Sequence, residues 1–282
     1  MRYNNHHIRD FISHFVSRKD MVIIMKCKIV TFNLRYLYDG DGVNSYIHRS
    51  AMVRNKIKAE KPDVIGFQEA TSEIVNDIIE SIPEYHVIFN GRDADFGGEG
   101  LAVALRKETV VLMGFDVFWL SKTPYVPGSR YEIQSMCPRI CQQVLVRLKG
   151  SDRPFWVFNN HLDHYEDDMA RILGIKQVLA HVSECKSKWE APVFILGDLN
   201  SLPDSEAIKY CENFENVKLA DLTAESGPTF HGFGKASVFK KIDYIFSDLR
   251  VEDCNCKVEC WSEAYNGIYL SDHYPVCVSL EI

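Results

Sequence analysis

The chain has 282 residues, of which 46 % are hydrophobic and 25 % are charged, and its formal net charge at pH 7 is −7. This composition excludes the disordered and fibrous classes of protein. The acidic balance argues against passive nucleic-acid binding, because such proteins usually present a net basic surface to the phosphates. It favours a small substrate over a long duplex, although local fields can oppose the net charge.

The N-terminal part differs from the rest of the chain. Residues 1–24 contain scattered charges and histidines, and the apolar run at residues 21–25 is too short for a signal peptide or a spanning helix. We expect residues 1–24 to be a loosely ordered extension, or the true start to be Met21 or Met25. Residues 25–282 show no repeat or flexible linker, which predicts a single domain.

Short apolar runs rich in Val, Ile and Phe recur through this domain and predict strands. These strands are expected at residues 28–33, 64–68, 86–89, 101–106, 110–119, 140–148, 155–160, 193–196, 242–246, 251–260 and 275–280. The strand at 193–196 is apolar throughout, so both of its faces should be buried.

Helices are expected at residues 46–59, 72–82 and 166–182. Thr71 is a suitable N-cap for the second of them. The third has an acidic first turn and one apolar stripe, as a helix on a sheet should. Many strands with few helices predict two packed sheets with helices outside.

The nine cysteines are odd in number and irregularly spaced, which indicates reduced thiols in a cytoplasmic protein. Cys254, Cys256 and Cys260 are close enough in sequence to suggest a thiolate metal site. No fourth cysteine follows at a zinc-type spacing, so we favour the interpretation that they share one face of a strand.

Polar side chains useful for chemistry gather at the ends of the predicted strands. They are Asn33, Glu69, His161, Asp198, Asn200, Asp243, Asp272 and His273. Strand ends at one edge of a sheet are where ligand sites form. Carboxylate oxygens suit Mg²⁺, and carboxylates with imidazoles can move protons beside a phosphate.

Taken singly, each of these motifs also has a structural explanation. The Gly197–Asn200 sequence suits a plain turn, Glu69 a capping role and His161 a structural role. Asp243 is the most informative, because a carboxylate between Ile242 and Tyr244 should be buried and buried charges need a partner. Arg139, at the start of a strand, either reaches a phosphate as a charge-assisted donor or is an ordinary surface arginine.

The order of the motifs is more specific than any one of them. They are Thr-Phe-Asn33-Leu-Arg, Gln-Glu69, Asn-His161-Leu-Asp-His, Gly-Asp198-Leu-Asn200, Ile-Asp243-Tyr-Ile and Ser-Asp272-His273-Tyr-Pro. Together they resemble the endonuclease/exonuclease/phosphatase superfamily, which includes DNase I-like nucleases. Residues 118–121, 127–129, 138–141 and 229–233 resemble its bacterial-type branch, whose substrates are mostly unassigned. A Gly-Trp pair expected after residue 129 is replaced by Arg130-Tyr131, which puts the substrate contacts there in doubt.

The resemblance implies an α/β fold of the α+β type, with two packed mixed β-sheets flanked by helices in a DNase I-like four-layer sandwich. Residues 25–282 would form the catalytic domain. It also implies Mg²⁺ as the cofactor, with Mn²⁺ as a substitute. Glu69 would be the main metal ligand, helped by Asn33 and Asp272.

The resemblance also implies roles for the remaining site residues. Asp198 would orient or deprotonate the attacking water, with Asn200 as its positioning partner. His273 would contact the phosphate and Asp243 would orient a histidine. His161 would stabilise the transition state or help to protonate the leaving oxygen.

The predicted function is therefore Mg²⁺-dependent hydrolysis of a phosphodiester or phosphomonoester, by in-line attack of water. The substrate would be a small molecule or a nucleic acid, so a nuclease acting on DNA or RNA is an alternative. A catalytically silent binding domain is a second alternative, disfavoured because every expected position is filled. A metallo-β-lactamase-type site lacks its first histidine at residues 159–164. We expect no membrane association and no obligate protein partner.

Overall fold

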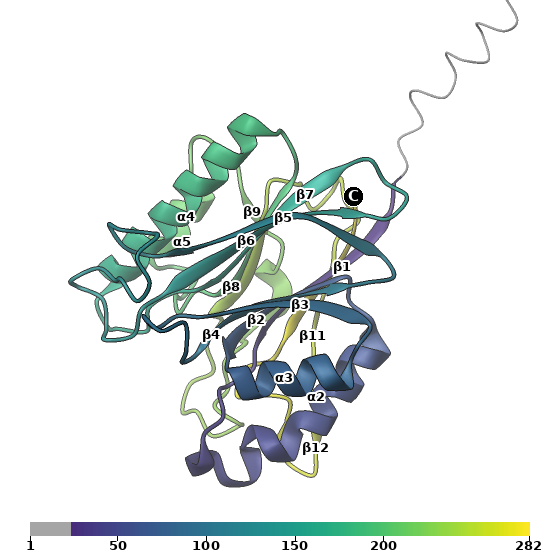
Figure 1. Ribbon diagram of the computed structural model, residues 1–282, viewed down its shortest axis with the longest axis vertical. Helices are drawn as coiled ribbons and strands as arrows, with labels where there is room; N and C mark the ends of the chain where they lie inside the picture. Colours follow the sequence, from purple (N-terminus) through teal and green to yellow (C-terminus); the bar gives the residue numbers. More distant parts are fainter. Residues whose placement is uncertain (1–23) are drawn as a thin grey trace, which may run out of the picture.

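Two six-stranded β-sheets pack face to face in the computed structural model, which describes residues 24–282 (Figure 1). The expected extension at residues 1–24 thus lies outside the described residues, apart from Ile24. The first sheet has the order β11-β14-β1-β2-β4-β3. Its strands are β1 (Lys26–Asn33), β2 (Val64–Ala70), β3 (Tyr85–Gly91), β4 (Gly100–Arg106), β11 (Lys257–Cys260) and β14 (Val276–Glu281).

The second sheet has the order β5-β6-β7-β8-β10-β9. Its strands are β5 (Val110–Trp119), β6 (Ile140–Leu148), β7 (Pro154–His161), β8 (Val193–Asp198), β9 (Ala220–Asp221) and β10 (Asp243–Ser247). As expected, every residue of β8 is buried. A small hairpin of β12 (Ala264–Tyr265) and β13 (Ile268–Tyr269) stands apart from both sheets.

Helices cover the outer face of each sheet, so the molecule has four layers (Figure 1). The first sheet is covered by α2 (Tyr46–Glu60) and α3 (Ser72–Ser81), and the second by α4 (Asp168–Lys188) and α5 (Glu206–Glu212). Short 3₁₀ segments, η1 (Asp39–Asn44) and η2 (Ala224–Ser226), lie in loops. The predicted fold, two packed mixed sheets flanked by helices, is confirmed.

The core is divided in the same way. One apolar cluster lies between the two sheets, where Ile29 and Val64 of the first sheet belong to the same cluster as Val157 and Leu196 of the second. Two further large clusters lie between each sheet and its helices, and a small fourth one contains Leu101, Trp119 and Ile140. Burial of these faces is the main force that holds the layers together.

One parallel pair lies in the middle of each sheet, β1 with β2 and β7 with β8, and the other pairs are antiparallel. The C-terminal ends of the two parallel pairs lie at the same edge of the sandwich, because Asn33 at the end of β1 contacts Asp198 at the end of β8. Antiparallel β10 and β14 begin at this edge. Polar residues from both sheets are therefore brought together here.

Two element predictions need correction. Residues 251–255 form turns, and only Lys257–Cys260 of the strand expected at 251–260 is extended. Glu252, Asp253 and Asn255 are exposed, and Asn255 has φ 48°, which ends a strand. The helix expected at 166–182 begins at Asp168, since Asp167 caps it by accepting from the Met169 N–H, and it continues to Lys188.

All nine cysteines are free thiols. Within residues 24–282, Cys254, Cys256 and Cys260 do not come together as a metal-ligating group. None of the helices in this part of the chain combines the length and apolar character needed to cross a bilayer.

Candidate active site

A cleft of about 1050 Å³ opens at the edge where the parallel pairs end. It is lined by seven of the residues predicted from the sequence: Glu69, Arg139, His161, Asp198, Asn200, Asp272 and His273. The other two, Asn33 and Asp243, are buried and contact residues that line it. All nine predicted residues therefore belong to one site.

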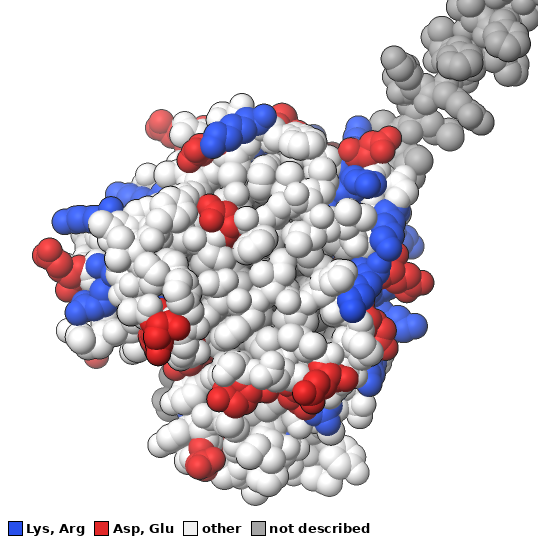
Figure 2. Space-filling model, in the orientation of Figure 1, with Lys and Arg blue, Asp and Glu red and all other residues white. Residues whose placement is uncertain are grey.

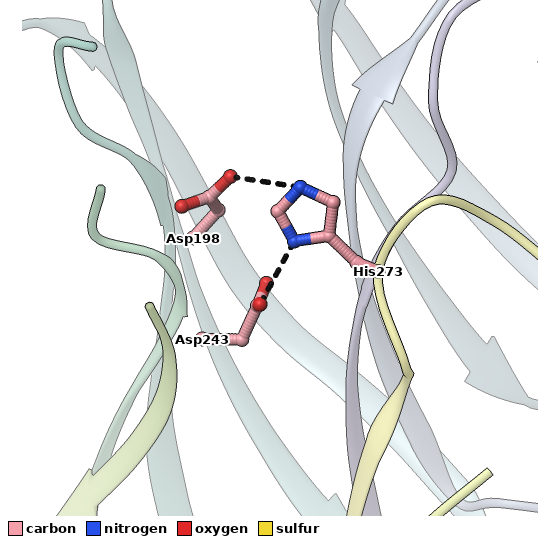
Figure 3. A group of neighbouring side chains, drawn as sticks. All are labelled: Asp198, Asp243 and His273. Carbon is pink, nitrogen blue, oxygen red and sulfur yellow. Dashed lines mark hydrogen bonds and ion pairs between the residues drawn. The ribbon is translucent and has the colours of Figure 1, made fainter. Parts of the chain in front are cut away.

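A buried chain of three groups forms the centre of the site (Figure 3). His273 Nδ1 lies 2.8 Å from Asp243 Oδ2, and its Nε2 lies 3.8 Å from Asp198 Oδ2. Burial alone would lower the pKa of His273, but the charges of Asp243 and Asp198 and the hydrogen bond to Asp243 raise it well above its ordinary value. This environment favours the imidazolium form.

The strand register explains this arrangement. Asp243 opens β10 directly opposite Asp198, the last residue of β8. His273 lies three residues before β14, which pairs with β1 of the other sheet. The histidine therefore comes from one sheet and both carboxylates from the other.

Asp198 is held by two amides. The Asn200 backbone N–H donates to Asp198 Oδ1 at 2.9 Å, and Asn33 Nδ2 donates to Oδ2 at 3.0 Å. Burial, and then the negative charge of Asp243, raise the pKa of Asp198 to about 7, against the opposing effects of His273 and these hydrogen bonds. A carboxylate with such a pKa is suited to accept a proton near neutral pH.

Glycine is required just before this carboxylate. Gly197 has φ 144°, and a Cβ at this position would lie 1.9 Å from the carbonyl oxygen of Asn160. The close approach of β7 and β8 therefore excludes any side chain here. Asn200, with φ 47°, completes the turn, so the turn-forming and the chemical explanations of this motif both apply.

Glu69 lies at an irregularity of β2, whose pairing with β4 shifts between Phe67 and Ala70. Its φ is 53°, an unfavourable backbone conformation for a residue with a Cβ. Its carboxylate accepts from Asn33 Nδ2 at 3.0 Å and from the Tyr36 backbone N–H at 3.1 Å. The irregularity therefore directs this carboxylate into the cleft.

Asp272 also faces the cleft. Burial raises its pKa, and the negative charge of Glu69 acts in the same direction. Arg35 Nε lies 3.9 Å from Asp272 Oδ2 but is bonded to Asp41 at 2.9 Å. The positive charges of His273, Arg35 and Arg49 oppose this rise in pKa. Two neighbouring carboxylates that line one cleft form a site that suits a cation with hard oxygen ligands.

Asn33 lies between these two groups. Its Nδ2 donates to both Glu69 and Asp198, while its Oδ1 accepts from the Arg35 backbone N–H at 2.9 Å. In this arrangement it positions two carboxylates, and direct ligation of a metal by Asn33 stays a prediction.

On the opposite flank of Asp198, His161 Nε2 lies 3.6 Å from Asp198 Oδ2. Burial and then the positive charges of Arg139 and Arg92 lower the pKa of His161 well below its ordinary value, so it is neutral. Arg139 is buried, and its Nη2 lies 2.9 Å from His164 Nδ1. Of the two interpretations that the sequence allowed for Arg139, the ordinary surface arginine is therefore wrong.

Asp198, Asp243 and His273 also have ligand atoms within 4.8 Å of one another. Asp243 does not line the cleft, and its carboxylate is already bonded to His273. We therefore interpret these three as a relay, in which Asp243 is hydrogen-bonded to His273 and Asp198 lies 3.8 Å from the other ring nitrogen. Glu69 and Asp272, whose oxygens face the cleft, are better placed to hold a metal.

Several contributors were not predicted. Arg92, paired with Glu99 at 3.0 Å, lines the cleft from a loop that carries no motif. Thr229 Oγ1 accepts from the backbone N–H groups of Ile242 and Asp243, both at 3.1 Å. Its stretch, residues 229–233, was singled out by resemblance, but nothing in the sequence indicated a positioning role.

Known proteins share both the sequence pattern and the fold. A protein of Acanthamoeba polyphaga mimivirus, uncharacterized protein L388, is 26 % identical over 257 residues, covering 85 % of this chain and 93 % of its own. A Bacteroides vulgatus endonuclease/exonuclease/phosphatase structure is 27 % identical with TM-score 0.83, covering 92 % of this chain and 99 % of that one. A Bacteroides thetaiotaomicron mannosyl-6-phosphatase shares the fold, with 24 % identity, TM-score 0.77 and coverage of 90 % and 99 %.

Residues 30–273 match the sequence pattern of one family, described as Endonuclease/Exonuclease/phosphatase. This range contains all nine residues of the site, and it spans both sheets. The chain therefore belongs to the endonuclease/exonuclease/phosphatase family, whose members are enzymes that hydrolyse phosphate ester bonds.

Proposed function

We propose that this protein is a Mg²⁺-dependent phosphoesterase in which water attacks phosphorus in line with the leaving oxygen. One observation carries the proposal. The buried relay of Asp243, His273 and Asp198 opens into the same cleft as the carboxylates of Glu69 and Asp272. A proton acceptor, a phosphate contact and an oxygen-rich cation site are thus adjacent.

Glu69 and Asp272 would hold the cation, because both carboxylates line the cleft and the nearest arginine, Arg35, is bonded to Asp41. Such oxygens are the ligands that Mg²⁺ prefers, and Mn²⁺ is expected to substitute. When bound, a divalent cation offsets negative charge on the phosphoryl oxygens.

The side chains of this chain would perform the remaining steps. Asp198, with a pKa raised to about 7, accepts a proton from the attacking water while Asn33 and Asn200 hold its oxygens. His273, oriented by Asp243, donates to a phosphoryl oxygen. His161 is neutral, so it acts as a hydrogen-bond donor toward the leaving oxygen and does not supply a full proton.

A small phosphate ester is the favoured substrate. The mannosyl-6-phosphatase shares this fold, and a cleft of about 1050 Å³ is suited to a small molecule. On the face in Figure 2, acidic and basic side chains lie mainly along the margin and the centre is largely uncharged. In the cleft itself, Arg35, Arg92 and Arg171 are paired with carboxylates, unlike the free basic groups with which nucleases hold a duplex. A nuclease remains the second candidate.

The test is hydrolysis with Mg²⁺, Mn²⁺ or EDTA present. The substrates are p-nitrophenyl phosphate, its bis ester, single- and double-stranded DNA, RNA, and sugar and inositol phosphates. We expect turnover that EDTA abolishes and that Glu69→Gln and His273→Ala each reduce at least about 100-fold. Glu108→Gln is the control, since Glu108 is exposed and outside the cleft.

Two further measurements examine the mechanism. Mg²⁺ should raise the melting temperature of the wild type, and it should do so much less for Glu69→Gln. In H₂¹⁸O the label should enter the phosphate. Label found in the leaving alcohol would contradict attack at phosphorus, and metal-independent turnover would contradict the role of the cation.

A further inference from the structure

One buried positive charge in the cleft has no partner of opposite sign within residues 24–282. Five Lys and Arg side chains line the cleft, and all but Arg139 are either paired with a carboxylate or exposed. The pairs are Arg35–Asp41 at 2.9 Å, Arg92–Glu99 at 3.0 Å and Arg171–Asp168 at 2.8 Å, and the exposed residue is Lys240. Arg139 is only 4 % exposed, and within residues 24–282 no carboxylate lies within 4.0 Å of it.

Most N–H donors of the Arg139 side chain also lack a partner within residues 24–282. A guanidinium has five N–H groups. Among the described residues the only partner of this one is His164 Nδ1, at 2.9 Å from Nη2, while Nε and Nη1 have none. A cavity of only about 10 Å³ adjoins the side chain beside Arg92 and His161, which is room for about one water.

The backbone fixes this guanidinium in place. Arg139 follows Pro138 and directly precedes β6, and its carbonyl oxygen accepts from the Leu120 N–H at 2.7 Å. Its positive charge acts on His161, which lies 3.6 Å from Asp198. A buried cation without a counterion destabilises a fold, so its presence beside the reacting groups indicates that an anion binds there.

We propose that Arg139 binds the third non-bridging oxygen of a phosphomonoester, which makes this protein a phosphomonoesterase. The inference rests on the proposed function and names its substrate class. In the proposed function, the cation held by Glu69 and Asp272 would offset the charge of one non-bridging oxygen, and His273 would donate a hydrogen bond to a second. A diester has no further non-bridging oxygen, whereas a monoester has one more and carries one more negative charge.

Arg139 would therefore favour monoesters over diesters as well as strengthen the binding of monoesters. A diester places an alkoxy group where the monoester has an anionic oxygen, and the guanidinium then stays buried without a counterion. Sites built to satisfy a buried polar group reject analogues that leave it unsatisfied. The planar guanidinium can also donate two parallel hydrogen bonds to a phosphate, which an ammonium cannot.

The test compares p-nitrophenyl phosphate with methyl p-nitrophenyl phosphate, a monoester and a diester that share one leaving group. The quantity measured is the ratio of their kcat/KM values, in the wild type and in Arg139→Gln. We expect the wild type to prefer the monoester, and Arg139→Gln to lower monoester kcat/KM about 10- to 100-fold and change diester kcat/KM less than about 3-fold. Arg139→Lys should restore the preference only in part.

Binding provides a readout that does not depend on turnover or on any variant. Inorganic phosphate should inhibit the wild type at least about 10-fold more tightly than dimethyl phosphate, and Arg139→Gln should remove most of this difference. Arg147→Gln is the matched control. Arg147 lies on β6, the strand that Arg139 directly precedes, and its Nη1 donates to the Ser151 carbonyl away from the cleft.

The outcomes separate this inference from the proposed function. If Glu69→Gln abolishes turnover of both esters but Arg139→Gln lowers both equally, the phosphoesterase stands and the monoester assignment fails. A wild type that prefers the diester, or that binds dimethyl phosphate as tightly as inorganic phosphate, also overturns the assignment. Turnover that survives Glu69→Gln overturns the proposed function itself.

Discussion

His273 takes its orientation from Asp243, a residue that does not line the cleft. The carboxylate accepts from Nδ1, so it fixes the orientation of the ring and leaves Nε2 facing Asp198 and the cleft. Asp243 is thus a positioning residue that acts on the phosphate through the imidazole.

Replacing Asp243 with Asn should therefore affect the reaction much more than binding. We expect kcat to fall by about 10²- to 10⁴-fold, because the amide does not compensate the charge of the imidazolium as a carboxylate does. KM should change little. Steady-state kinetics with p-nitrophenyl phosphate would test this, with Asp253→Asn, an exposed carboxylate, as the control. A raised KM with an unchanged kcat would mean that Asp243 contributes to binding instead.

The identity of the site residues could be read from the sequence, but their connections could not. Asp243 was predictable, since an acid inside an apolar strand needs a partner. The bond from Asn33 to Asp198 joins residues 165 positions apart, and it depends on how two sheets pack. The lone charge of Arg139 likewise emerges only when every neighbouring carboxylate has been placed.

At the scale of elements, the site depends on close contact between the sheets. Gly66 of β2 faces the second sheet, and a Cβ there would lie 2.1 Å from Leu196 Cδ1 and 2.8 Å from Asn159 Oδ1. Asn159 also donates to the carbonyl oxygens of Phe67 and Ala102 across the same interface. The sheets therefore meet closely two residues before Asp198.

Gly66→Ala should force the sheets apart. We expect the free energy of unfolding to fall by about 1–3 kcal/mol, as in other overpacked cores. Gly114→Ala, in β5, is the control, because a Cβ there meets nothing within 4 Å and should change stability by less than about 0.5 kcal/mol. Urea denaturation measures both. Similar losses in the two variants would show that strand propensity, and not contact between the sheets, is responsible.

A second element-scale feature is residues 229–232, which join the strand of Asp243 to the loop of His273. Thr229 Oγ1 accepts from the Ile242 and Asp243 N–H groups, and the His231 and Gly232 N–H groups donate to the Asp272 carbonyl oxygen. This short segment therefore holds the start of β10, with Asp243, close to the loop that carries His273.

Thr229→Val keeps the shape of the side chain and removes the acceptor. It should lower the free energy of unfolding by about 1–3 kcal/mol, because two buried N–H groups lose their partner, and it should also lower kcat. Thr229→Ser keeps the hydroxyl, so it should retain most of the stability and most of kcat. Chemical denaturation and kinetics on the three proteins test this. Equal behaviour of the valine and serine variants would rule out the hydroxyl as the cause.

Elements with a clear periodic pattern were predictable, whereas short or mixed ones were not. The apolar run of β8 identified a fully buried strand. Cys254, Cys256 and Cys260 occupy even positions, as on one face of a strand, but the exposed charges at Glu252 and Asp253 favour turns at the start of this stretch. The seven residues of α5 are too few for helical periodicity to be recognised.

At the scale of the whole molecule, burial determines which of the nine thiols can react. Burial raises the pKa of Cys256 and Cys260 to about 11, and raises those of Cys27 and Cys141 well above the ordinary value. Few of these thiols are ionised at pH 8, and the thiolate is the reactive form. Cys137, half-buried, lines the cleft.

We therefore expect one fast thiol, Cys137, when the native protein is treated with an aromatic disulfide reagent at pH 8. Inorganic phosphate with Mg²⁺ should slow this phase, and Cys137→Ala should remove it. Cys256 and Cys260 should react faster as the pH rises toward 11, because their thiolate fraction grows. All nine should react in denaturant. A fast phase that persists in Cys137→Ala would contradict this assignment.

The residues of the site come from two kinds of segment, the ends of core strands and a long connection. His161, Asp198 and Asp243 lie at strand ends that cannot move without disturbing the core, whereas Arg139 lies at the end of the long connection between β5 and β6. Changes in length or sequence of that connection could therefore alter which phosphates are accepted and leave the hydrolytic step intact. A lineage carrying this fold could diversify its substrates by varying one surface segment, and the connection between β5 and β6 is where engineered changes of selectivity should begin.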